Sequence, residues 1–400
     1  MHINVEFFDT EPIENLITCI HHKMDKVIYF GYEKVIKKYE KRTRDFLEKY
    51  CENPIVEFHA IETHDLNKVI EKISEVVEKV DTDENTVYFD ITGGESLFLV
   101  AFGVLADKLK KPMHMYDIEN DQLIHLGNSY GDHVGNVNGY DFEWNLYKYI
   151  EMSGAKIDKD RMDKSFVDDE VFMSKVDVVW DIVKEYRNHW NDYASVFRDK
   201  LNQPDSLDAS GVVVQKKQVN IAKFYRFAKK LEAAGVLSYV KSEPLSWNQK
   251  GWITESKFSI TYADYKWKDG LTKIGTILEL RVYKDLKDAG KEVLQSVHID
   301  WDGVLESEQK KSLVPEQQKV ENVLNEIDVL TLEGIISTFI SCKCGNMDQG
   351  KALTPMYELE TVATRFGGKY SKKRLATLKE VTGAYAERAE EMGIELWCCE

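Results

Sequence analysis

The sequence predicts an α/β protein with two separate sheets and a helical or winged-helix-like connector between them. Three observations support this. The chain has 400 residues, which is more than a domain with a single hydrophobic core usually has. Strand and helix patterns alternate over the first 127 residues, and a second such alternation lies near the C-terminus. The 43% hydrophobic content supplies enough apolar material for several packed cores. We therefore expect domains over residues 1–150 and 266–400, with a connector over 151–265.

Short apolar runs alternate with amphipathic stretches in the first part of the chain. Strands are expected over 2–8, 26–31, 55–60 and 86–91, helices over 12–22, 33–51, 65–80 and 95–108, and a hairpin-like pair over 112–127. In the stretch 65–80, Leu66, Val69, Ile73 and Val77 recur at helical spacing on one face. Strands that alternate with helices in this way predict a doubly wound, mostly parallel, Rossmann-like sheet.

The middle of the chain is predominantly helical before it ends in two strands. Helical patterns cover 170–202 and 217–234, the second closed by Gly235, and strands are expected over 236–240 and 252–262. A helix followed by a hairpin outlines a winged-helix module. A plain connector remains the alternative.

The C-terminal part contains its own strands and helices. Helices are expected over 271–289, 354–366 and 383–392, and strands over 292–300, 325–331, 336–344, 373–379 and 394–398. Three consecutive strands near the start of this alternation predict a second α/β domain with its own sheet.

Composition excludes several classes of protein. A net charge of −16 argues against a protein that coats nucleic acid through a broad basic surface. No run approaches 18 apolar residues, so we expect a cytoplasmic protein without a membrane partner. The six cysteines form no CxxC pair, which favours reduced thiols over a zinc ribbon or a disulfide framework.

An acid and a lysine on adjacent predicted strands are the main candidates for chemistry. Lys343 follows Asp328 by 15 residues, so a hairpin can bring both side chains to one place. Glu279 lies on the preceding helix. Glu279, Asp328 and the carbonyl of Cys342 are the hard oxygen ligands that magnesium or manganese prefers, and Lys343 is placed to act on water and phosphate. The alternative is a surface cross-strand ion pair, which contributes little.

This arrangement resembles the PD-(D/E)xK nuclease family, with its restriction-endonuclease-like α/β fold. Asp328 matches the first acid of the family and Lys343 its lysine, whereas Ser341 stands where the family has a second acid. Glu279 is the first candidate to replace that acid, followed by Glu326, which shares a strand face with Asp328. The resemblance implies a metal-dependent phosphodiesterase.

A second candidate site follows the predicted strand 86–91. In an open α/β sheet, ligands bind beyond the carboxyl ends of the strands, and Thr92-Gly93-Gly94 lies at such a place. The glycines permit close approach of the backbone, and Thr92 offers a hydroxyl. The turn is neither a GxGxxG fingerprint nor a GxxxxGK[ST] loop, which disfavours NAD binding and ATP hydrolysis.

Residues 1–150 resemble the CARF family of CRISPR-associated Rossmann-fold sensors. The resemblance rests on Asp9-x-x-Pro12-Ile13-x-Asn15-Leu16 after the first strand and Asp90-x-Thr92-Gly93-Gly94 after the fourth. It implies a homodimer that binds cyclic oligoadenylate across its two-fold axis. The implied ligand-site residues are Asp9, Thr10, Glu11, Asp90, Thr92, Gly93, Gly94, Glu95 and Ser96.

The two resemblances together are typical of the ancillary nucleases of type III CRISPR systems. They imply activation by cyclic tetra-adenylate and metal-dependent cleavage of DNA, RNA or both in antiviral defence. A HEPN ribonuclease is disfavoured, because Arg187-Asn188-His189 has the wrong spacing. Two alternatives remain: a ligand-responsive winged-helix DNA-binding regulator with an inactive nuclease-like domain, and a hydrolase that degrades the ring itself.

Overall fold

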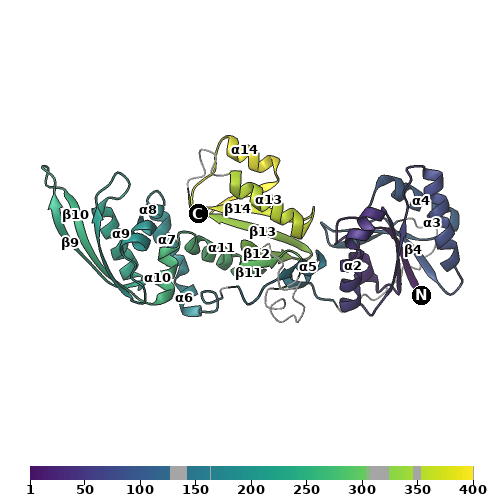
Figure 1. The fold of residues 1–400 in the computed structure, drawn as a ribbon, viewed down its shortest axis with the longest axis horizontal. Helices are drawn as coiled ribbons and strands as arrows, with labels where there is room; N and C mark the ends of the chain where they lie inside the picture. The colour runs from purple at the N-terminus through teal and green to yellow at the C-terminus, as the bar shows by residue number, and fades with distance from the viewer. Residues whose placement is uncertain (127–141, 163, 304, 306–323, 346–352, 400) are drawn as a thin grey trace, which may run out of the picture.

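The structure, a computed structural model, describes residues 1–126, 142–162, 164–303, 305, 324–345 and 353–399. Three lobes lie in a row (Figure 1). The N-terminal sheet forms one end, the sheet of the C-terminal strands lies in the middle, and a three-stranded sheet with its helices forms the other end. The chain is thus a mixed α/β protein.

The N-terminal lobe is a six-stranded sheet in the order β3-β2-β1-β4-β5-β6. Its strands are β1 (His2–Phe7), β2 (Lys26–Gly31), β3 (Ile55–Ala60), β4 (Thr86–Asp90), β5 (Met113–Asp117) and β6 (Gln122–Leu126), and its helices are α1 (Ile17–His22), α2 (Glu33–Tyr50), α3 (Leu66–Val80) and α4 (Ser96–Leu109). All neighbours are parallel except β5 and β6. The order of the first five strands, β3-β2-β1-β4-β5, is the one found in a Rossmann-like sheet.

Helices cover both faces of this sheet. One apolar cluster joins the sheet to α1 and α2 through Ile17 and Phe46, and another joins it to α3 and α4 through Val69 and Phe102. The side chain of Asp65 begins α3 by accepting hydrogen bonds from two amides of its first turn. The mostly parallel, doubly wound sheet expected from the sequence is confirmed for this lobe.

The helix expected over 12–22 is shorter than the apolar spacing indicated. Only Ile17–His22 is α-helical, because the residues before it form turns that the Asn15 side chain holds. Asn15 accepts a hydrogen bond from the amide of Asp9 at 3.0 Å and donates one to the carbonyl of Asp9 at 2.8 Å. A side chain that bonds the main chain in this way competes with helix formation.

The middle lobe is a six-stranded sheet in the order β15-β14-β13-β12-β11-β7. Its strands are β7 (Lys156–Ile157), β11 (Glu292–Asp300), β12 (Leu324–Glu333), β13 (Ile336–Lys343), β14 (Lys372–Thr377) and β15 (Ile394–Cys398), and its helices are α11 (Thr276–Asp288), α13 (Leu353–Gly367) and α14 (Ala384–Glu391). The strands β13, β14 and β15 are parallel and the others antiparallel. The strand β7 comes from the stretch expected to be connector, yet it pairs with β11.

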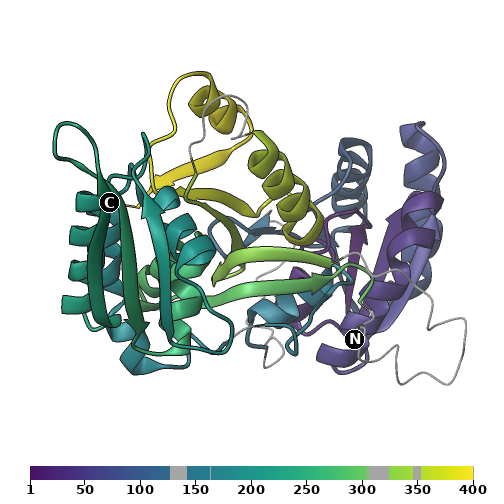
Figure 2. The same ribbon diagram turned by 60° about the vertical axis from the view of Figure 1, so that its left-hand side comes forward.

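The remaining lobe carries a three-stranded antiparallel sheet, β8-β10-β9. Its strands are β8 (Asp208–Val214), β9 (Leu237–Trp247) and β10 (Ile253–Tyr262), and its helices are α6 (Glu170–Ser174), α7 (Val176–Glu185), α8 (Trp190–Lys200), α9 (Ile221–Ala233) and α10 (Tyr265–Thr272). Figure 2 shows β9 and β10 as long strands at the edge of the molecule.

The helical stretch expected over 170–202 is confirmed and divides into three helices. The helix expected over 271–289 begins later, at Thr276, after α10 has ended at Thr272. The strand β8 was not expected, because its polar first half lacks a strand pattern. Trp180 and Trp190 are fully buried core residues, so they offer no base-stacking surface.

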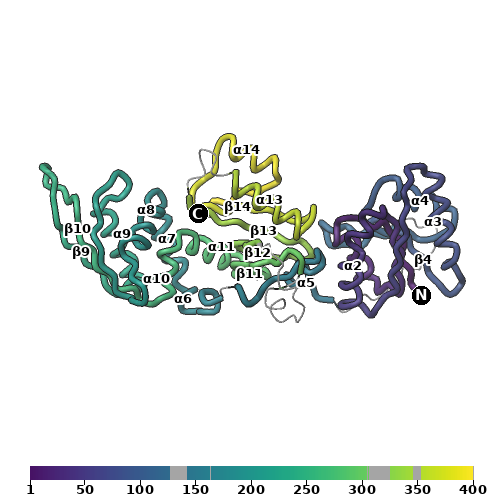
Figure 3. The backbone as a smooth tube through the Cα atoms, in the orientation of Figure 1, coloured from purple at the N-terminus to yellow at the C-terminus, as the bar shows by residue number. Residues whose placement is uncertain are grey.

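The N-terminal and middle lobes share an apolar core and polar contacts. The helix α5 (Leu146–Met152) packs against α2 on one side and α13 on the other, as the tube in Figure 3 shows. Arg42 and Arg365, one from each lobe, donate hydrogen bonds to the carbonyl of Ser153 at 3.3 and 3.2 Å. A cavity of about 680 Å³ lies beside these arginines. No helix in the described part of the chain is long and apolar enough to cross a membrane.

Candidate functional site

The Asp328 carboxylate is the centre of a cluster in the middle lobe. Its Oδ2 atom accepts hydrogen bonds from the Ser341 hydroxyl at 3.2 Å and the Cys342 amide at 2.6 Å, and it lies 3.5 Å from Lys343 Nζ. The antiparallel ladder pairs Val329 with Ile340, which brings Asp328 next to Ser341, and Lys343 follows two residues later on the same face. The hairpin thus brings the acid and the lysine together.

The backbone is distorted opposite Asp328. The strands β11 and β12 pair Gln295 with Val329 and Val297 with Ile327, but Ser296 between them has a φ of 50° and makes no ladder pair. A left-handed conformation at a serine within a strand is strained. Its hydroxyl donates a hydrogen bond to the Glu326 carboxylate at 3.1 Å.

Glu279 reaches the same cluster from the first turn of α11. Burial raises the pKa of Glu279 to about 7, with the negative charges of Asp328 and Glu326 adding to the effect and Lys343 opposing it. A Cβ on Gly275 would lie 2.6 Å from Glu279 Oε1, so the glycine leaves room for the carboxylate. Asp328 and Lys343 therefore both act on the charge of Glu279, Asp328 by repulsion and Lys343 by attraction.

Of the candidate carboxylate ligands, Glu279 and Asp328 belong to the cluster, whereas Glu326 lies at the surface. Among the described residues, no group of three or more His, Cys, Asp and Glu side chains could hold a metal ion. Glu326 is exposed, and Cys342 contacts Asp328 through its amide nitrogen instead of its carbonyl. Magnesium is usually held by one or two carboxylates, with water and substrate phosphates as further ligands, and Glu279 with Asp328 fits that pattern.

The basic patch Lys372-Lys373-Arg374 is largely occupied by internal contacts. Lys373 donates to Glu360 and to the Met392 carbonyl, and Arg374 forms two hydrogen bonds with Glu395. The charged groups of Lys373 and Arg374 are therefore already paired with acceptors within the described structure.

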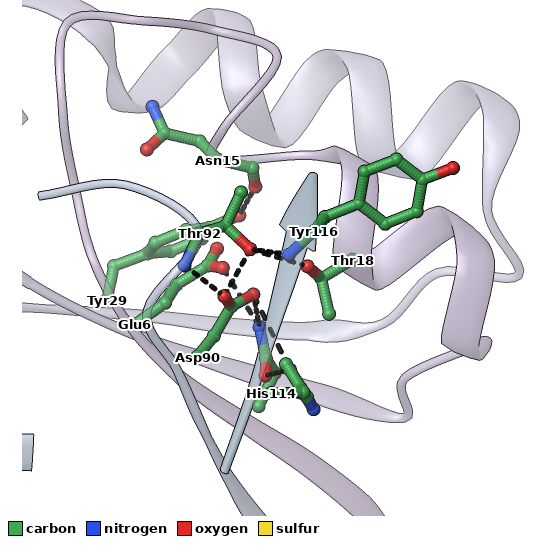
Figure 4. Close-up of polar contacts among 9 residues, drawn as sticks. Glu6, Asn15, Thr18, Tyr29, Asp90, Thr92, His114 and Tyr116 are labelled. Carbon is green, nitrogen blue, oxygen red and sulfur yellow. Dashed lines mark hydrogen bonds and ion pairs between the residues drawn. The ribbon is translucent and has the colours of Figure 1, made fainter. Parts of the chain in front are cut away.

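The N-terminal turn is held from below by Asp90, at the end of β4. Asp90 Oδ1 accepts hydrogen bonds from the amide of Thr92 at 2.7 Å and its hydroxyl at 2.5 Å, and the same hydroxyl accepts the amide of Tyr116 at 2.8 Å (Figure 4). Asp90 is 1% exposed, so it positions the turn and does not reach its surface. The Thr92 hydroxyl, expected to face a ligand, is used inside the protein.

Sequence reasoning missed a polar layer beneath this turn. Asn4 Nδ2 donates to Glu6 at 2.9 Å and to Asp90 at 3.2 Å, and His114 lies 3.6 Å from Asp90. Burial raises the pKa of Glu6, and the charge of Asp90 raises it further. Burial would also raise the pKa of Asp90, but His114 and the hydrogen bonds from His114, Thr18 and Thr92 together lower it. The signal for this layer was two polar residues alternating in the otherwise apolar strand β1.

The two glycines of the turn are required by close packing. A Cβ on Gly93 would lie 2.2 Å from Glu14 Oε2, and a Cβ on Gly94 would lie 2.7 Å from Phe7 Cβ. Gly94 also has a φ of 130°, which L-residues rarely adopt. The turn therefore rests directly on the first loop and on β1.

The other expected ligand residues divide between two surfaces. Glu95 accepts a hydrogen bond from the Tyr32 hydroxyl and Ser96 is exposed, both next to the glycine turn. The Asp9 carboxylate instead accepts the amide of Thr10 at 2.5 Å. The carboxylate of Glu11 is directed to the middle lobe, where it accepts the amide of Lys369 at 3.0 Å.

Comparisons with known proteins identify shared folds only. No family matches the sequence, and neither does any curated protein. Protein VC1899 from Vibrio cholerae superposes with a TM-score of 0.65 at 17% identity, over 99% of this chain and 93% of that one. Can2 from Sulfobacillus thermosulfidooxidans, solved in complex with cyclic tetra-adenylate, gives a TM-score of 0.66 at 14% identity, over 100% of this chain and 96% of that one. The chain therefore shares its fold with these two proteins from end to end.

Proposed function

We propose that the chain is a metal-dependent nuclease of type III CRISPR defence that cyclic tetra-adenylate activates. In this proposal the N-terminal lobe is a CARF sensor domain that dimerises, and the middle lobe is a PD-(D/E)xK nuclease domain for DNA, RNA or both. The observation that carries it is the convergence of Asp328, Lys343 and Glu279 at one place on the middle sheet. The shared fold with Can2 supports the pairing of the two domains.

The proposed chemistry is hydrolysis of a phosphodiester. A magnesium or manganese ion, when bound by Glu279 and Asp328, supplies charge neutralisation at the phosphate and lowers the pKa of bound water. Lys343 donates hydrogen bonds to the phosphate or to the attacking water and opposes the negative charge that develops. The water oxygen loses one proton to solvent and forms a new bond to phosphorus, the bond from phosphorus to the leaving sugar oxygen breaks, and that oxygen takes up a proton from solvent.

The proposed ligand site is the outer surface of the glycine turn together with the first loop. The hydroxyl of Thr92 is committed to Asp90 and Tyr116, so a ring phosphate would meet main-chain amides at the start of α4. The 680 Å³ cavity is lined by Thr10 and Glu11 but by none of residues 92–96, so in this proposal it adjoins the ligand site without containing the glycine turn, and a second copy would complete the site.

The test is cleavage of plasmid DNA and of single-stranded DNA and RNA, with and without cyclic tetra-adenylate and Mn²⁺. We expect cleavage only with both, and a loss of about 100-fold or more in Lys343→Met and in Asp328→Asn. The control is Lys291→Met, because Lys291, just before β11, forms an ion pair at 2.7 Å with Glu333 at the end of β12. Unchanged cleavage in the first two variants would exclude this site.

The lobe with β8, β9 and β10 favours a second candidate, a ligand-responsive DNA-binding regulator. The hairpin of β9 and β10 exposes Trp247, Trp252 and Leu245 near its tip. Exposed aromatic residues on a protruding hairpin suit contact with a nucleic-acid groove. Gel-shift titration of duplex DNA with the parent and with Trp252→Ala tests it: tight sequence-selective binding without cleavage would favour this candidate.

A further inference from the structure

Glu14 connects the glycine turn of the N-terminal lobe to the middle lobe. It is 3% exposed, and its Oε1 atom accepts hydrogen bonds from the Tyr370 hydroxyl at 2.5 Å and from Lys369 Nζ at 2.7 Å. On its other side the carboxylate packs against Gly93, where a Cβ would lie 2.2 Å from Oε2 and 2.4 Å from Cδ. The Glu14 side chain therefore contacts both the glycine turn, which is the proposed ligand site, and the middle lobe.

The contact with the middle lobe is reinforced by Glu11. Its carboxylate accepts the amide of Lys369 at 3.0 Å, and a Cβ on Gly368 would lie 2.2 Å from Glu11 Oε2. Gly368 has a φ of 67°, which favours glycine. Two carboxylates from the first loop thus hold the turn that precedes β14.

This turn leads directly to the strand next to the candidate nuclease residues. The strand β14 begins at Lys372 and pairs in parallel with β13, where Leu375 lies opposite Ser341 and Thr377 opposite Lys343. The sheet is a stiff element, because each β14 residue is fixed by its ladder partner. A displacement at the turn would therefore move the β14 residues that pair with Ser341 and Lys343.

The carboxylate of Glu14 has little freedom to absorb a movement. Its Oε2 atom is buried and accepts no hydrogen bond from any described residue, while Oε1 is held by two donors. Burial raises the pKa of Glu14, and the hydrogen bonds from Lys369 and Tyr370 oppose that effect. A shift of the Gly93 backbone must move the carboxylate and so alter its contacts with Lys369 and Tyr370.

We propose that Glu14 is a positioning residue that transmits ligand occupancy of the Thr92–Gly94 turn to β14 and Lys343 through Tyr370 and Lys369. The proposal rests on the proposed function for its ligand and its output, whereas the contacts that form the link are independent of that function. Contacts that couple the two sites act in both directions: if ligand binding shifts the position of β14, then a change in the position of β14 must change the affinity for the ligand by the same factor.

The link is testable without ligand or substrate by hydrogen exchange of the full chain. In Gly93→Ala the added Cβ displaces Glu14, and we expect amide exchange in residues 368–377 to rise by about threefold or more. Gly103→Ala is the matched control, since nothing lies within 4 Å of a Cβ there. Acceleration confined to residues 1–126 would overturn the proposal.

The same link is tested from the middle lobe with Tyr370→Phe, which removes one hydroxyl. We expect faster amide exchange at residues 92–95, whereas Tyr357→Phe, which removes a hydroxyl that accepts a hydrogen bond from Arg388 at 3.5 Å, leaves these amides unchanged. Unchanged amide exchange at residues 92–95 in Tyr370→Phe would reject the link, even if Gly93→Ala proves too unstable to measure.

Activity separates this proposal from the proposed function. If cyclic tetra-adenylate activates the parent, we expect Tyr370→Phe to lower the ratio of activated to basal cleavage by roughly tenfold and also to lower the affinity for the ligand. If exchange is transmitted but the parent is never activated, the link stands and the proposed function fails. If activation is intact in Tyr370→Phe, the link fails and the function stands.

Discussion

Glu279 on α11 lies near Asp328 on β12, and burial together with the charge of Asp328 raises the pKa of Glu279 to about 7. Its unperturbed pKa is 4.5. Between these two values the folded chain holds a proton on Glu279 that the unfolded chain has released, so the free energy of unfolding falls as pH rises from about 4.5 to 7 and levels off above it.

The first prediction follows from this sign. In EDTA, urea unfolding of the parent at a series of pH values should lose on the order of 2 kcal/mol across that range relative to Glu279→Gln, which carries no titrating proton. Under the proposed function, Mn²⁺ should restore the loss above pH 7 and cleavage should rise with pH through about 7. Identical pH profiles of stability in parent and variant would contradict the burial of this carboxylate.

The second prediction concerns Gly94. Replacement by alanine places a Cβ 2.7 Å from Phe7 Cβ and strains a φ of 130°. We expect Gly94→Ala to destabilise the protein by about 1–3 kcal/mol and to weaken binding of cyclic tetra-adenylate. Gly103→Ala, in the middle of α4, should instead stabilise by about 0.5–1 kcal/mol. Thermal unfolding and calorimetric titration measure both effects, and equal behaviour of the two variants would refute the packing argument.

The third prediction addresses the commitment of the Thr92 hydroxyl. Thr92→Val keeps the side-chain shape but leaves the amide of Tyr116 without its acceptor and removes a donor from buried Asp90. The expected cost is about 2–3 kcal/mol in the free energy of unfolding. Thr361→Val, at a hydroxyl on the exposed face of α13, should cost less than about 0.5 kcal/mol. A small effect at Thr92 together with a large loss of ligand affinity would show that the hydroxyl serves the ligand after all.

Much of the fold was predictable because its elements carry strong local signals. The strands β2, β11 and β15 are short apolar or alternating runs between polar turns, and the structure places them within one residue of the expected bounds. The turns that replace the expected helix before Ile17 were not predictable from apolar spacing, since the interaction of Asn15 with Asp9 decides the backbone there. Weakly patterned β8 is recruited by pairing with β10, which no local signal reports.

The candidate site was predictable only in its strand-borne members. The spacing of Asp328 and Lys343 fits any hairpin, so their meeting follows from the register, whereas the approach of Glu279 depends on how α11 packs on the sheet. The direction of Glu11 depends on the middle lobe, which local sequence around residue 11 cannot report. For the same reason the bridge through Glu14 could not be inferred from the first loop alone.

The last prediction tests the missing acid. Ser341 Oγ lies 3.2 Å from Asp328 Oδ2, so a carboxylate at residue 341 adds a third hard donor on the face shared by Asp328 and Lys343. We expect Ser341→Glu to raise Mn²⁺ affinity by about tenfold, because charge count strengthens oxygen-ligand sites. Without metal the same variant should lose about 1–2 kcal/mol of stability, since the like charges repel.

Ser341→Gln has the same size without the charge, so it should change neither Mn²⁺ affinity nor stability in this way. Calorimetric Mn²⁺ titration and urea unfolding in EDTA distinguish the Ser341→Glu and Ser341→Gln variants. Equal metal affinity in the two variants would mean that no cation is held between Asp328 and residue 341.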